Sequence, residues 1–388
     1  MKSPLRGTVA AIGVGETPYY RRGASPEPVL KLTLRAIVAA CEDAGISPKS
    51  IDGFASYAHD PNEGPLLMGP LGIPEIRWSS MIAGGGGGGL PAAIGAAAAA
   101  IVSGQAETIV VYRGYAERDA GRLNDVMRKL LQGFPHYFPH GVTATIPVGA
   151  MRTRRMVEVG GVPASTFQAF VRAEYFHAQQ NPRALAFGKP LSDADYLASR
   201  MISDPLRLVD NSRENDAAAA IILTSAARAR DLPKAPVYLL GCAQGTSNGE
   251  IWETDKDYHT AGMRDVADRL WRQSGMSPSD VDVAQIYENF SGPAVASMID
   301  HGLCTAESAG EFLTFENLTA PRGKLPINTS GGLIAEGNVH GMGLALEAVR
   351  QLRGESTNPV PNAKVCLLAG GPIATYVSSA LFGTAAAL

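Results

Sequence analysis

Apolar residues near the start of the chain follow two periods, and each period indicates one kind of element. Residues 7–14 alternate small and apolar side chains in the manner of a buried strand. Residues 29–44 repeat apolar side chains at helical spacing, which predicts a helix with one apolar face. Gly45 follows directly, and glycine is the residue type that most often ends a helix. Residues 51–56 then predict a second strand.

The same order of elements recurs in the second half of the chain. Residues 237–242 predict a strand, 263–274 a helix and 281–286 another strand, and the helix again ends in Gly-x-Ser-Pro. Five positions of the two copies are identical: Gly45 and Gly275, Ser47 and Ser277, Pro48 and Pro278, Asp52 and Asp282, and Tyr57 and Tyr287. A repeat this long predicts two similar α/β halves, and each copy ends at a tyrosine.

The downstream part of each half also corresponds. A glycine cluster, a helix of small residues and a strand follow in both: 84–89, 90–103 and 108–112 in the first half, and 331–343, 344–352 and 365–368 in the second. Alternating strands and helices predict parallel or mixed sheets covered by helices. The Ala- and Gly-rich helices are thin enough for burial between two layers. We place the halves at 1–234 and 235–388.

One stretch of the first half breaks the repeat. Residues from about 117 to 201 are rich in Arg, His, Phe and Tyr, and are expected to form an insertion that shapes a site or a contact. Residues 217–224 predict the strand that returns to the first core, and 226–236 a linker.

Composition excludes several classes of function. The 388 residues carry a formal net charge of −3, which gives no electrostatic reason to expect nucleic acid. The four cysteines lack metal-ligand spacing and are too few for a disulfide framework, so a reducing cytoplasm is expected. The start of the chain lacks the apolar stretch of a signal peptide, and the longest apolar run, 90–102, is too short to span a membrane.

Three residues are candidates for chemistry. Tyr287 ends a predicted strand where a loop begins, a favoured place for a site; alternatively it is a packed aromatic, as we expect for Tyr57. His340 lies on a glycine-flanked loop, and a pKa near neutrality would suit proton transfer, although a lone histidine is more often structural. Asn338 is either an amide donor or a turn former. Glu288 and Asn289 either orient Tyr287 or cap a helix.

Other motifs are weaker. Gly84, Gly86 and Gly89 match Gly-x-Gly-x-x-Gly, but six consecutive glycines match almost any glycine motif, and residues 81–83 make a poor preceding strand. Residues 245–249 match a nucleophile elbow at Ser247, but no helix is expected to follow at once. His136 and His140 have metal-ligand spacing, yet two prolines argue against a helical pairing and no third ligand is evident. No metal is therefore expected.

Several longer motifs together resemble the thiolase superfamily, in particular its sterol-carrier and lipid-transfer type. They are Asn215-Asp-Ala-Ala-Ala-Ala-Ile-Ile-Leu223, Gln285-Ile-Tyr-Glu-Asn-Phe290, Leu325-Pro-Ile-Asn-Thr-Ser-Gly-Gly332, Gly337-Asn-Val-His-Gly-Met-Gly343 and Ala369-Gly-Gly371. The resemblance covers essentially the whole chain. It implies two α/β halves packed as a five-layered α-β-α-β-α sandwich.

The nucleophile of this family is missing. Thiolases carry a cysteine at the N-terminus of the buried helix of the first half, a position that falls near Gly87, in open space that a branched substrate could enter. The second family cysteine falls at Leu367 or Leu368, with Cys366 out of register. The usual acyl-enzyme route is therefore not expected.

The pattern is similar to the steroid side-chain-cleaving aldolases of this superfamily. The resemblance implies a retro-aldol split of a bulky β-hydroxyacyl-CoA into a ketone and a shorter acyl-CoA, with Tyr287 as an acid–base group. The family's second tyrosine falls near Asn338, where this chain has none, so its role passes to His340 or is lost. Residues expected against the substrate are Gly87, Gly88, Ser247, Asn289, Gly370 and Gly371. Coenzyme A is expected only as part of the substrate, with no separate cofactor.

The resemblance also implies partners. We expect a homodimer bound to a small acyl-CoA-associated protein with an OB-fold and a zinc ribbon, and neither nucleic acid nor membrane. Two other functions stay open: a non-catalytic acyl-CoA-binding or scaffolding subunit, and an acyltransferase that uses a relocated nucleophile such as Cys366 or Ser247.

Overall fold

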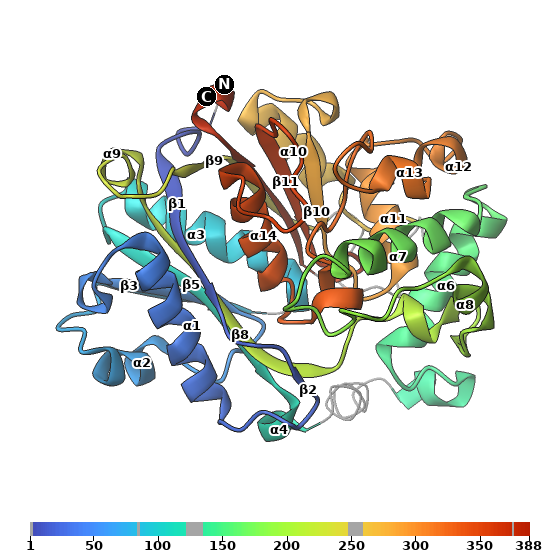
Figure 1. The fold of residues 1–388 in the computed structure, drawn as a ribbon, viewed down its shortest axis with the longest axis horizontal. Helices are drawn as coiled ribbons and strands as arrows, with labels where there is room; N and C mark the ends of the chain where they lie inside the picture. The colour runs from blue at the N-terminus through green and yellow to red at the C-terminus, as the bar shows by residue number, and fades with distance from the viewer. Residues whose placement is uncertain (1–2, 84–85, 122–134, 247–258, 375) are drawn as a thin grey trace.

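A computed structural model describes residues 3–83, 86–121, 135–246, 259–374 and 376–388 (Figure 1). Its main element is a ten-stranded mixed sheet in the order β10-β11-β12-β9-β1-β8-β5-β3-β4, with β2 (Tyr20–Arg21) paired to β8. The first half contributes β1 (Val9–Glu16), β3 (Gly53–Tyr57), β4 (Trp78–Ile82), β5 (Thr108–Ala116) and β8 (Asn215–Ser225). The second contributes β9 (Val237–Gly245), β10 (Val283–Ile286), β11 (Val365–Gly370) and β12 (Val377–Gly383).

The two parts of the sheet meet at a short seam between β1 and β9. Only Ala10 with Tyr238 and Ala11 with Val237 pair there. On each side of the seam the strands pair over longer stretches, so the sheet consists of two parts joined at one edge.

Two helices lie between the two parts of the sheet; the first consists mainly of Ala, whereas the second also carries Leu, Glu, Gln and Arg, so the prediction of a second small-residue helix is wrong. These are α3 (Leu90–Val102) and α14 (Met342–Arg353), which lie near the centre of Figure 1 and contact strands of both halves. A Cβ added at Gly95 of α3 would come within 2.6 Å of Cys242 Sγ on β9, which explains why the helix must be thin.

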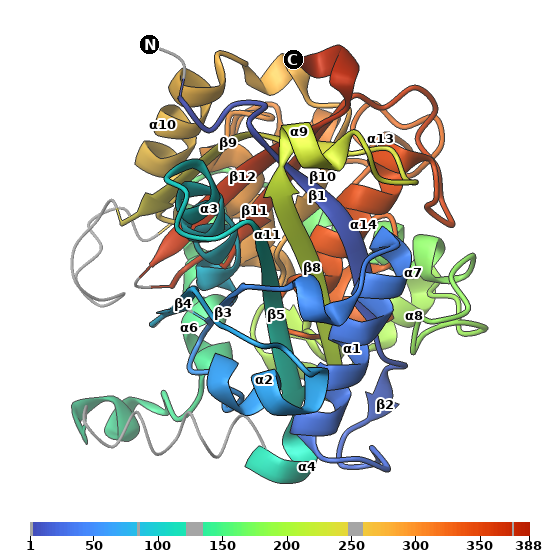
Figure 2. The ribbon, with the colours of Figure 1, turned by 90° about the vertical axis from the view of Figure 1, so that its left-hand side faces the viewer.

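Longer helices cover the outer faces. In Figure 2, α1 (Val29–Ala44) lies across β1, β5 and β8, while α10 (Arg264–Ser274) packs on β9 and β12 and α11 (Ser291–Asp300) lies beside β10. Gly45 and Gly275 end α1 and α10 in the left-handed conformation, as predicted. The layers follow the order α-β-α-β-α, which confirms the predicted thiolase fold.

The insertion forms helices of its own; the first lies at the bottom of Figure 1, and the others are drawn in green at its right. They are α4 (Glu117–Ala120), α6 (Thr145–Glu158), α7 (Ser165–Ala178) and α8 (Asp193–Ala198), followed by the hairpin β6 (Met201–Ser203) and β7 (Leu206–Arg207). α6 and α7 pack on α11, and α7 also contacts a π-helical turn, Gly332–Glu336. The insertion therefore lies against the second half of the chain.

Short elements complete the fold: α2 (Gly64–Leu71), α9 (Ala226–Ala229), α12 (Ala309–Phe312), α13 (Phe315–Leu318), and 3-10 turns at Pro48–Ser50, Gly86–Gly89, Pro135–His140, Leu208–Asp210, Pro278–Asp280 and Ala385–Ala387. The His136 side chain lies outside the described residues, so the argument against a metal pairing with His140 stays a prediction. Among the described residues no group of three metal-ligating side chains occurs, and no helix is long and apolar enough to cross a membrane.

Candidate active site

Tyr287 lies at the meeting point of the two halves. It directly follows β10, and its backbone N–H donates to the carbonyl oxygen of Ala369 on β11 at 2.8 Å. Tyr287 is 6% exposed, and its ring fits between two glycines: a Cβ added at Gly87 would lie 1.9 Å from Cε2, and one added at Gly341 would lie 2.7 Å from Cδ2. The absence of side chains at both positions makes room for the ring.

The expectation of open space at Gly87 is therefore wrong. The tyrosine ring from the second half fills the place that a side chain at Gly87 would take. Gly87 lies in the turn before α3, and Gly341 is the residue before α14. The positive ends of two helix dipoles thus face the Tyr287 ring, an environment that favours negative charge.

Opposing effects act on the Tyr287 hydroxyl. Burial, and then the nearby Glu288, raise the pKa of Tyr287 above its ordinary value. The Arg113 guanidinium and the backbone N–H of Gly87 pull the pKa down, because both stabilise the phenolate. The hydroxyl is neutral at physiological pH, and the groups that would hold its ionised form are already in place.

His340 lies on a strained loop beside this tyrosine. Its φ of 47° is unusual for a residue with a side chain, and the Asn338 side-chain oxygen stabilises it by accepting the His340 backbone N–H at 2.8 Å. Asn215, at the start of β8, clamps the loop in turn: its side chain accepts from the Asn338 backbone N–H at 2.6 Å and donates to the Asn338 carbonyl oxygen at 3.0 Å. The shape of the loop therefore depends on two asparagine side chains.

The His340 ring is held from two sides. Nδ1 accepts a hydrogen bond from Nε of Arg113 at 3.2 Å, and the Tyr115 ring packs 4.7 Å away. Burial and the Arg113 charge lower the pKa of His340 well below 6.5, so the prediction of a pKa near neutrality is wrong. The imidazole is neutral.

Arg113 connects these elements and was not predicted from the sequence. It is 5% exposed on β5, forms an ion pair with Asp60 at 3.2 Å, and donates to the Tyr57 carbonyl oxygen at 3.1 Å. The Tyr57 hydroxyl donates to the carbonyl oxygen of His340 at 2.9 Å, which confirms that Tyr57 is a packed, satisfied aromatic. A sequence signal existed: Arg113 interrupts an otherwise uncharged, apolar strand near its end.

Glu288 takes the capping role, because its Oε1 accepts from the backbone N–H groups of Leu333 and Ile334 in the first turn of the π-helical segment Gly332–Glu336. Asn289 Oδ1 accepts from the N–H of Phe290 at 3.0 Å. Glu288 is fully buried beside Glu174 of α7. Burial raises the pKa of both carboxyl groups, so each binds a proton more readily than an exposed carboxylate does. The buried pair therefore holds the residue after Tyr287 against α7 and the turn at Leu333.

Comparison with known proteins identifies this arrangement. Residues 243–384 match the family model of the thiolase C-terminal domain-like proteins. The chain is 35% identical to a 17-hydroxy-3-oxo-4-pregnene-20-carboxyl-CoA lyase of Mycobacterium tuberculosis, with 95% of this chain and 97% of that protein covered. It is 32% identical to a steroid side-chain-cleaving aldolase of Thermomonospora curvata, with 96% and 97% covered. The chain belongs to the family of the thiolase-like side-chain-cleaving aldolases.

Solved structures agree. The structure of an Ltp2-ChsH2(DUF35) aldolase superposes with a TM-score of 0.90 at 30% identity, and 98% of this chain and 99% of that chain are covered. Human mitochondrial 3-ketoacyl-CoA thiolase has the same fold, with a TM-score of 0.69 at 16% identity and 98% and 99% coverage.

In this aldolase-family chain the remaining glycines serve close packing. A Cβ at Gly88 would come within 2.0 Å of the Tyr376 carbonyl oxygen, and one at Gly371 within 2.0 Å of the Gly88 nitrogen. Gly370 meets the Gly87 carbonyl oxygen at 2.8 Å in the same way. The end of β11 therefore packs backbone to backbone on the start of α3. Residues 81–83 were also misjudged, because β4 does precede the glycine run.

Two residues, Cys366 and Ser247, were considered as alternative nucleophiles. Cys366 is 0% exposed between the sheets, and burial raises the pKa of its thiol well above the ordinary value, so it is not an accessible nucleophile. Ser247 lies outside the described residues.

Proposed function

We propose that this chain cleaves a bulky β-hydroxyacyl-CoA by a retro-aldol reaction, which releases a ketone and a shorter acyl-CoA. The observation that carries the proposal is the Tyr287 ring in the place of a side chain at Gly87, beside Arg113 and His340. The names of the two relatives, an acyl-CoA lyase and a side-chain-cleaving aldolase, support a steroid-type substrate.

Tyr287 acts as the principal acid–base group. Its phenolate takes the proton of the β-hydroxyl, the bond between the α- and β-carbons breaks, and the β-carbon becomes the ketone. The electron pair of that bond passes to the α-carbon and the thioester oxygen as an enolate. Tyr287 then returns the proton to the α-carbon, so the proton balance closes without a second base. One residue suffices because the β-oxygen and the α-carbon are close in the substrate.

The surrounding groups stabilise the charges of this sequence. Arg113 and the Gly87 N–H stabilise the phenolate, and the helix N-termini at Gly87 and Gly341 favour negative charge in the same region. His340 and Asn338 assist on the side of the thioester oxygen. The side-chain oxygen of Asn338 accepts the His340 backbone N–H, and its Nδ2 donates one N–H to Ser212 Oγ at 3.5 Å. The second N–H of Nδ2 is then left to donate to the substrate.

Tyr287→Phe tests the proposal. The variant keeps the ring between the two glycines and removes only the hydroxyl, so its stability should be close to that of the wild type while cleavage falls by at least about 10³-fold. Products are measured as ketone and short acyl-CoA by mass spectrometry with a panel of β-hydroxyacyl-CoAs. Tyr112→Phe, which removes a buried hydroxyl bonded to the Asn62 carbonyl oxygen, is the matched control. Cleavage by Tyr287→Phe at the control rate would contradict the assignment, and binding without cleavage by the wild type would favour a scaffolding role.

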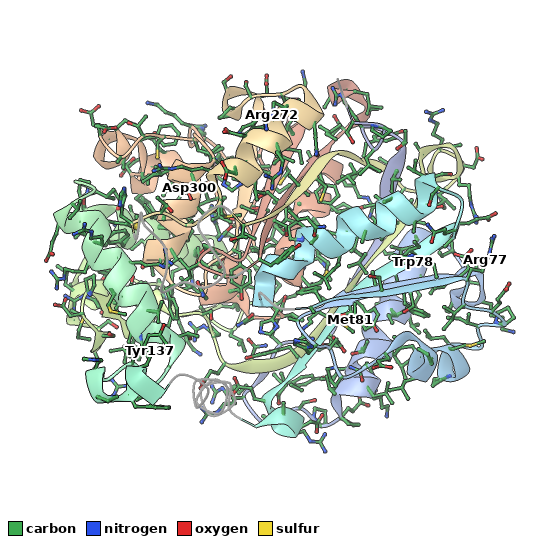
Figure 3. The ribbon with its side chains drawn as sticks, turned by 180° about the vertical axis from the view of Figure 1, so that it is seen from behind. Arg77, Trp78, Met81, Tyr137, Arg272 and Asp300 are labelled. Atoms are coloured by element: carbon green, nitrogen blue, oxygen red, sulfur yellow. The ribbon has the colours of Figure 1, made fainter. Side chains whose placement is uncertain are left out.

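We also propose a homodimer formed through the edge of the sheet at β4. This strand pairs only with β3 among the described strands; Trp78 and Met81 on it are half-exposed, and Arg77 just before it is exposed (Figure 3). A free strand edge pairs readily with a second strand. Because β4 leads into the glycine run, such pairing would also fix the start of α3. Trp78→Glu should halve the mass seen by light scattering, and an unchanged mass would rule out this edge.

We propose a small partner protein as well. The similar Ltp2 chain is found in an aldolase together with ChsH2(DUF35). Seven exposed large apolar side chains among the described residues of this chain lie in or just after the insertion: Met151, Val159, Phe176, Phe187, Leu197, Met201 and Leu208. Co-expression with a candidate partner of that type should raise yield and activity, and an isolated chain with full activity would argue against it.

A further inference from the structure

The hydrogen bond between Arg113 and His340 determines which ring nitrogen carries the proton. Arg113 Nε donates to His340 Nδ1 at 3.2 Å. A guanidinium is always protonated in proteins and has no acceptor, so the nitrogen that it contacts must offer a lone pair. A neutral imidazole with its lone pair on Nδ1 carries its only proton on Nε2.

We propose that Arg113 is a positioning residue that fixes His340 as the Nε2–H tautomer, and that this N–H donates to the thioester oxygen of the substrate as the enolate forms. The inference rests on the proposed retro-aldol function and refines it. His340 then has no free lone pair with which to act as a base. It becomes the donor that stabilises the developing oxyanion.

Arg113 is itself held rigidly enough for this role. Its Nη1 contacts Asp60 Oδ2 at 3.2 Å and the Tyr57 carbonyl oxygen at 3.1 Å. Asp60 is fixed in turn by the backbone N–H groups of Asn62 at 2.8 Å and Gly114 at 2.7 Å. The guanidinium therefore has one orientation, and Nε points at His340.

The other neighbours of His340 leave this tautomer undisturbed. The Tyr115 ring packs against the imidazole at 4.7 Å, and its hydroxyl donates to Glu117 Oε1 at 3.1 Å. The Tyr57 hydroxyl binds the His340 carbonyl oxygen, not the ring. The Tyr287 ring lies against Gly341, the next residue along the chain. Among the described residues, Arg113 is thus the group that forms a hydrogen bond with the His340 ring, and it acts as the donor.

The chemistry needs a donor at this point. When the carbon–carbon bond breaks, negative charge moves onto the thioester oxygen, and the loss of one preorganised donor in such a site typically costs about 10²–10³-fold in rate. A neutral N–H suits the task because it does not protonate the enolate oxygen outright. The depressed basicity of His340 keeps the ring in this neutral form.

Two substitutions test which ring nitrogen of His340 donates, because each places an N–H near only one of the two nitrogen positions. The side-chain amide of glutamine places an N–H near the Nε2 position, whereas that of asparagine places one near Nδ1. We expect His340→Gln to lose about tenfold in cleavage and His340→Asn to lose about 10²–10³-fold. Asparagine tolerates a φ of 47° better than glutamine does, so a purely structural role would give the opposite order. Equal activities, or the higher activity in His340→Asn, would overturn the proposal.

A spectroscopic measurement tests the tautomer without any substrate. The full-length protein is labelled with ¹⁵N-histidine, and the NMR signals of the His340 ring are identified as those that are lost in the His340→Gln variant. These signals should show the Nε2–H pattern at every pH from about 6 to 9. Arg113→Met should give a mixture of tautomers and a ring that protonates at higher pH, and Arg113→Lys should restore part of the wild-type pattern. An Nδ1–H or imidazolium pattern in the wild type would refute the inference. Failure of all acyl-CoA substrates would refute the proposed function alone, because the NMR result does not depend on turnover.

Discussion

Gly87→Ala offers the most direct test of the arrangement around Tyr287. The added methyl carbon would lie 1.9 Å from Cε2 and 2.4 Å from both Cδ2 and Cζ of the ring, whereas ordinary contacts begin at 3.4 Å. The clash involves the flat face of a buried ring, so a small side-chain rotation does not relieve it. The ring must move by about 1.5 Å, or the backbone at the start of α3 must give way.

The expected losses follow from this displacement. Overpacking of a buried site costs about 1–3 kcal/mol in the free energy of unfolding. A misplacement of about 1 Å in a reacting group can cost about 10²-fold in rate, so kcat/KM should fall by at least that factor. Urea unfolding and a steady-state cleavage assay measure the two quantities on the same preparation.

Gly95→Ala is the matched control. Its methyl group would overpack the same helix, 2.6 Å from Cys242 Sγ, but would not reach Tyr287. It should cost similar stability and leave kcat/KM within about threefold. The double variant Gly87→Ala/Tyr287→Ala completes a cycle: with the ring removed, the methyl group should cost almost no further stability, which gives a coupling of about 1–3 kcal/mol. Additive losses in that cycle, or full activity of Gly87→Ala, would refute the placement of the ring.

Three further outcomes follow. Because burial raises the pKa of Tyr287 and its phenolate is the base, kcat/KM should rise with pH across about pH 6–9, and a flat profile would contradict that role. Burial also raises the pKa of Glu288 in the folded protein above the unfolded value of about 4.3. Above that pH the folded protein keeps a proton that the unfolded chain has lost, so the free energy of unfolding should decrease as pH rises. Glu288→Gln should flatten this decrease in urea unfolding at a series of pH values; an unchanged slope would place the titration elsewhere. Asn215→Ala should lower kcat by about 10–100-fold and stability by about 1–3 kcal/mol through loss of the loop clamp, whereas unchanged kinetics would show that the His340 loop holds its own shape.

The features that were predicted correctly from the sequence are those encoded by neighbouring residues. Both copies of the strand–helix–turn repeat are present, and Tyr287 follows β10 as expected, because apolar periodicity and glycine stops are encoded by neighbouring residues. β12 and β4 were missed. β12 is buried along its whole length and shows no alternation of polar and apolar residues, and β4 contains two serines and continues into glycine.

The site itself depends on long-range contacts that no local pattern contains. Tyr287 fills the space at Gly87, two hundred residues away in sequence, and Arg113 binds His340 across 227 residues. The sequence therefore predicted individual residues but not their partners. The unoccupied space inferred from a run of glycines was wrong for this reason: glycines show that something lies close by, and only the fold shows what it is.

The two repeated tyrosines make each half incomplete on its own. Tyr57 of the first half supports the His340 loop of the second, and Tyr287 of the second covers the helix start of the first. A chain cut within residues 226–236 would yield two fragments, each with half of this exchange. Catalysis would return only when the fragments reassemble, so turnover would report on the docking of one half against the other. Each copy of the duplicated unit thus places its tyrosine against the other copy.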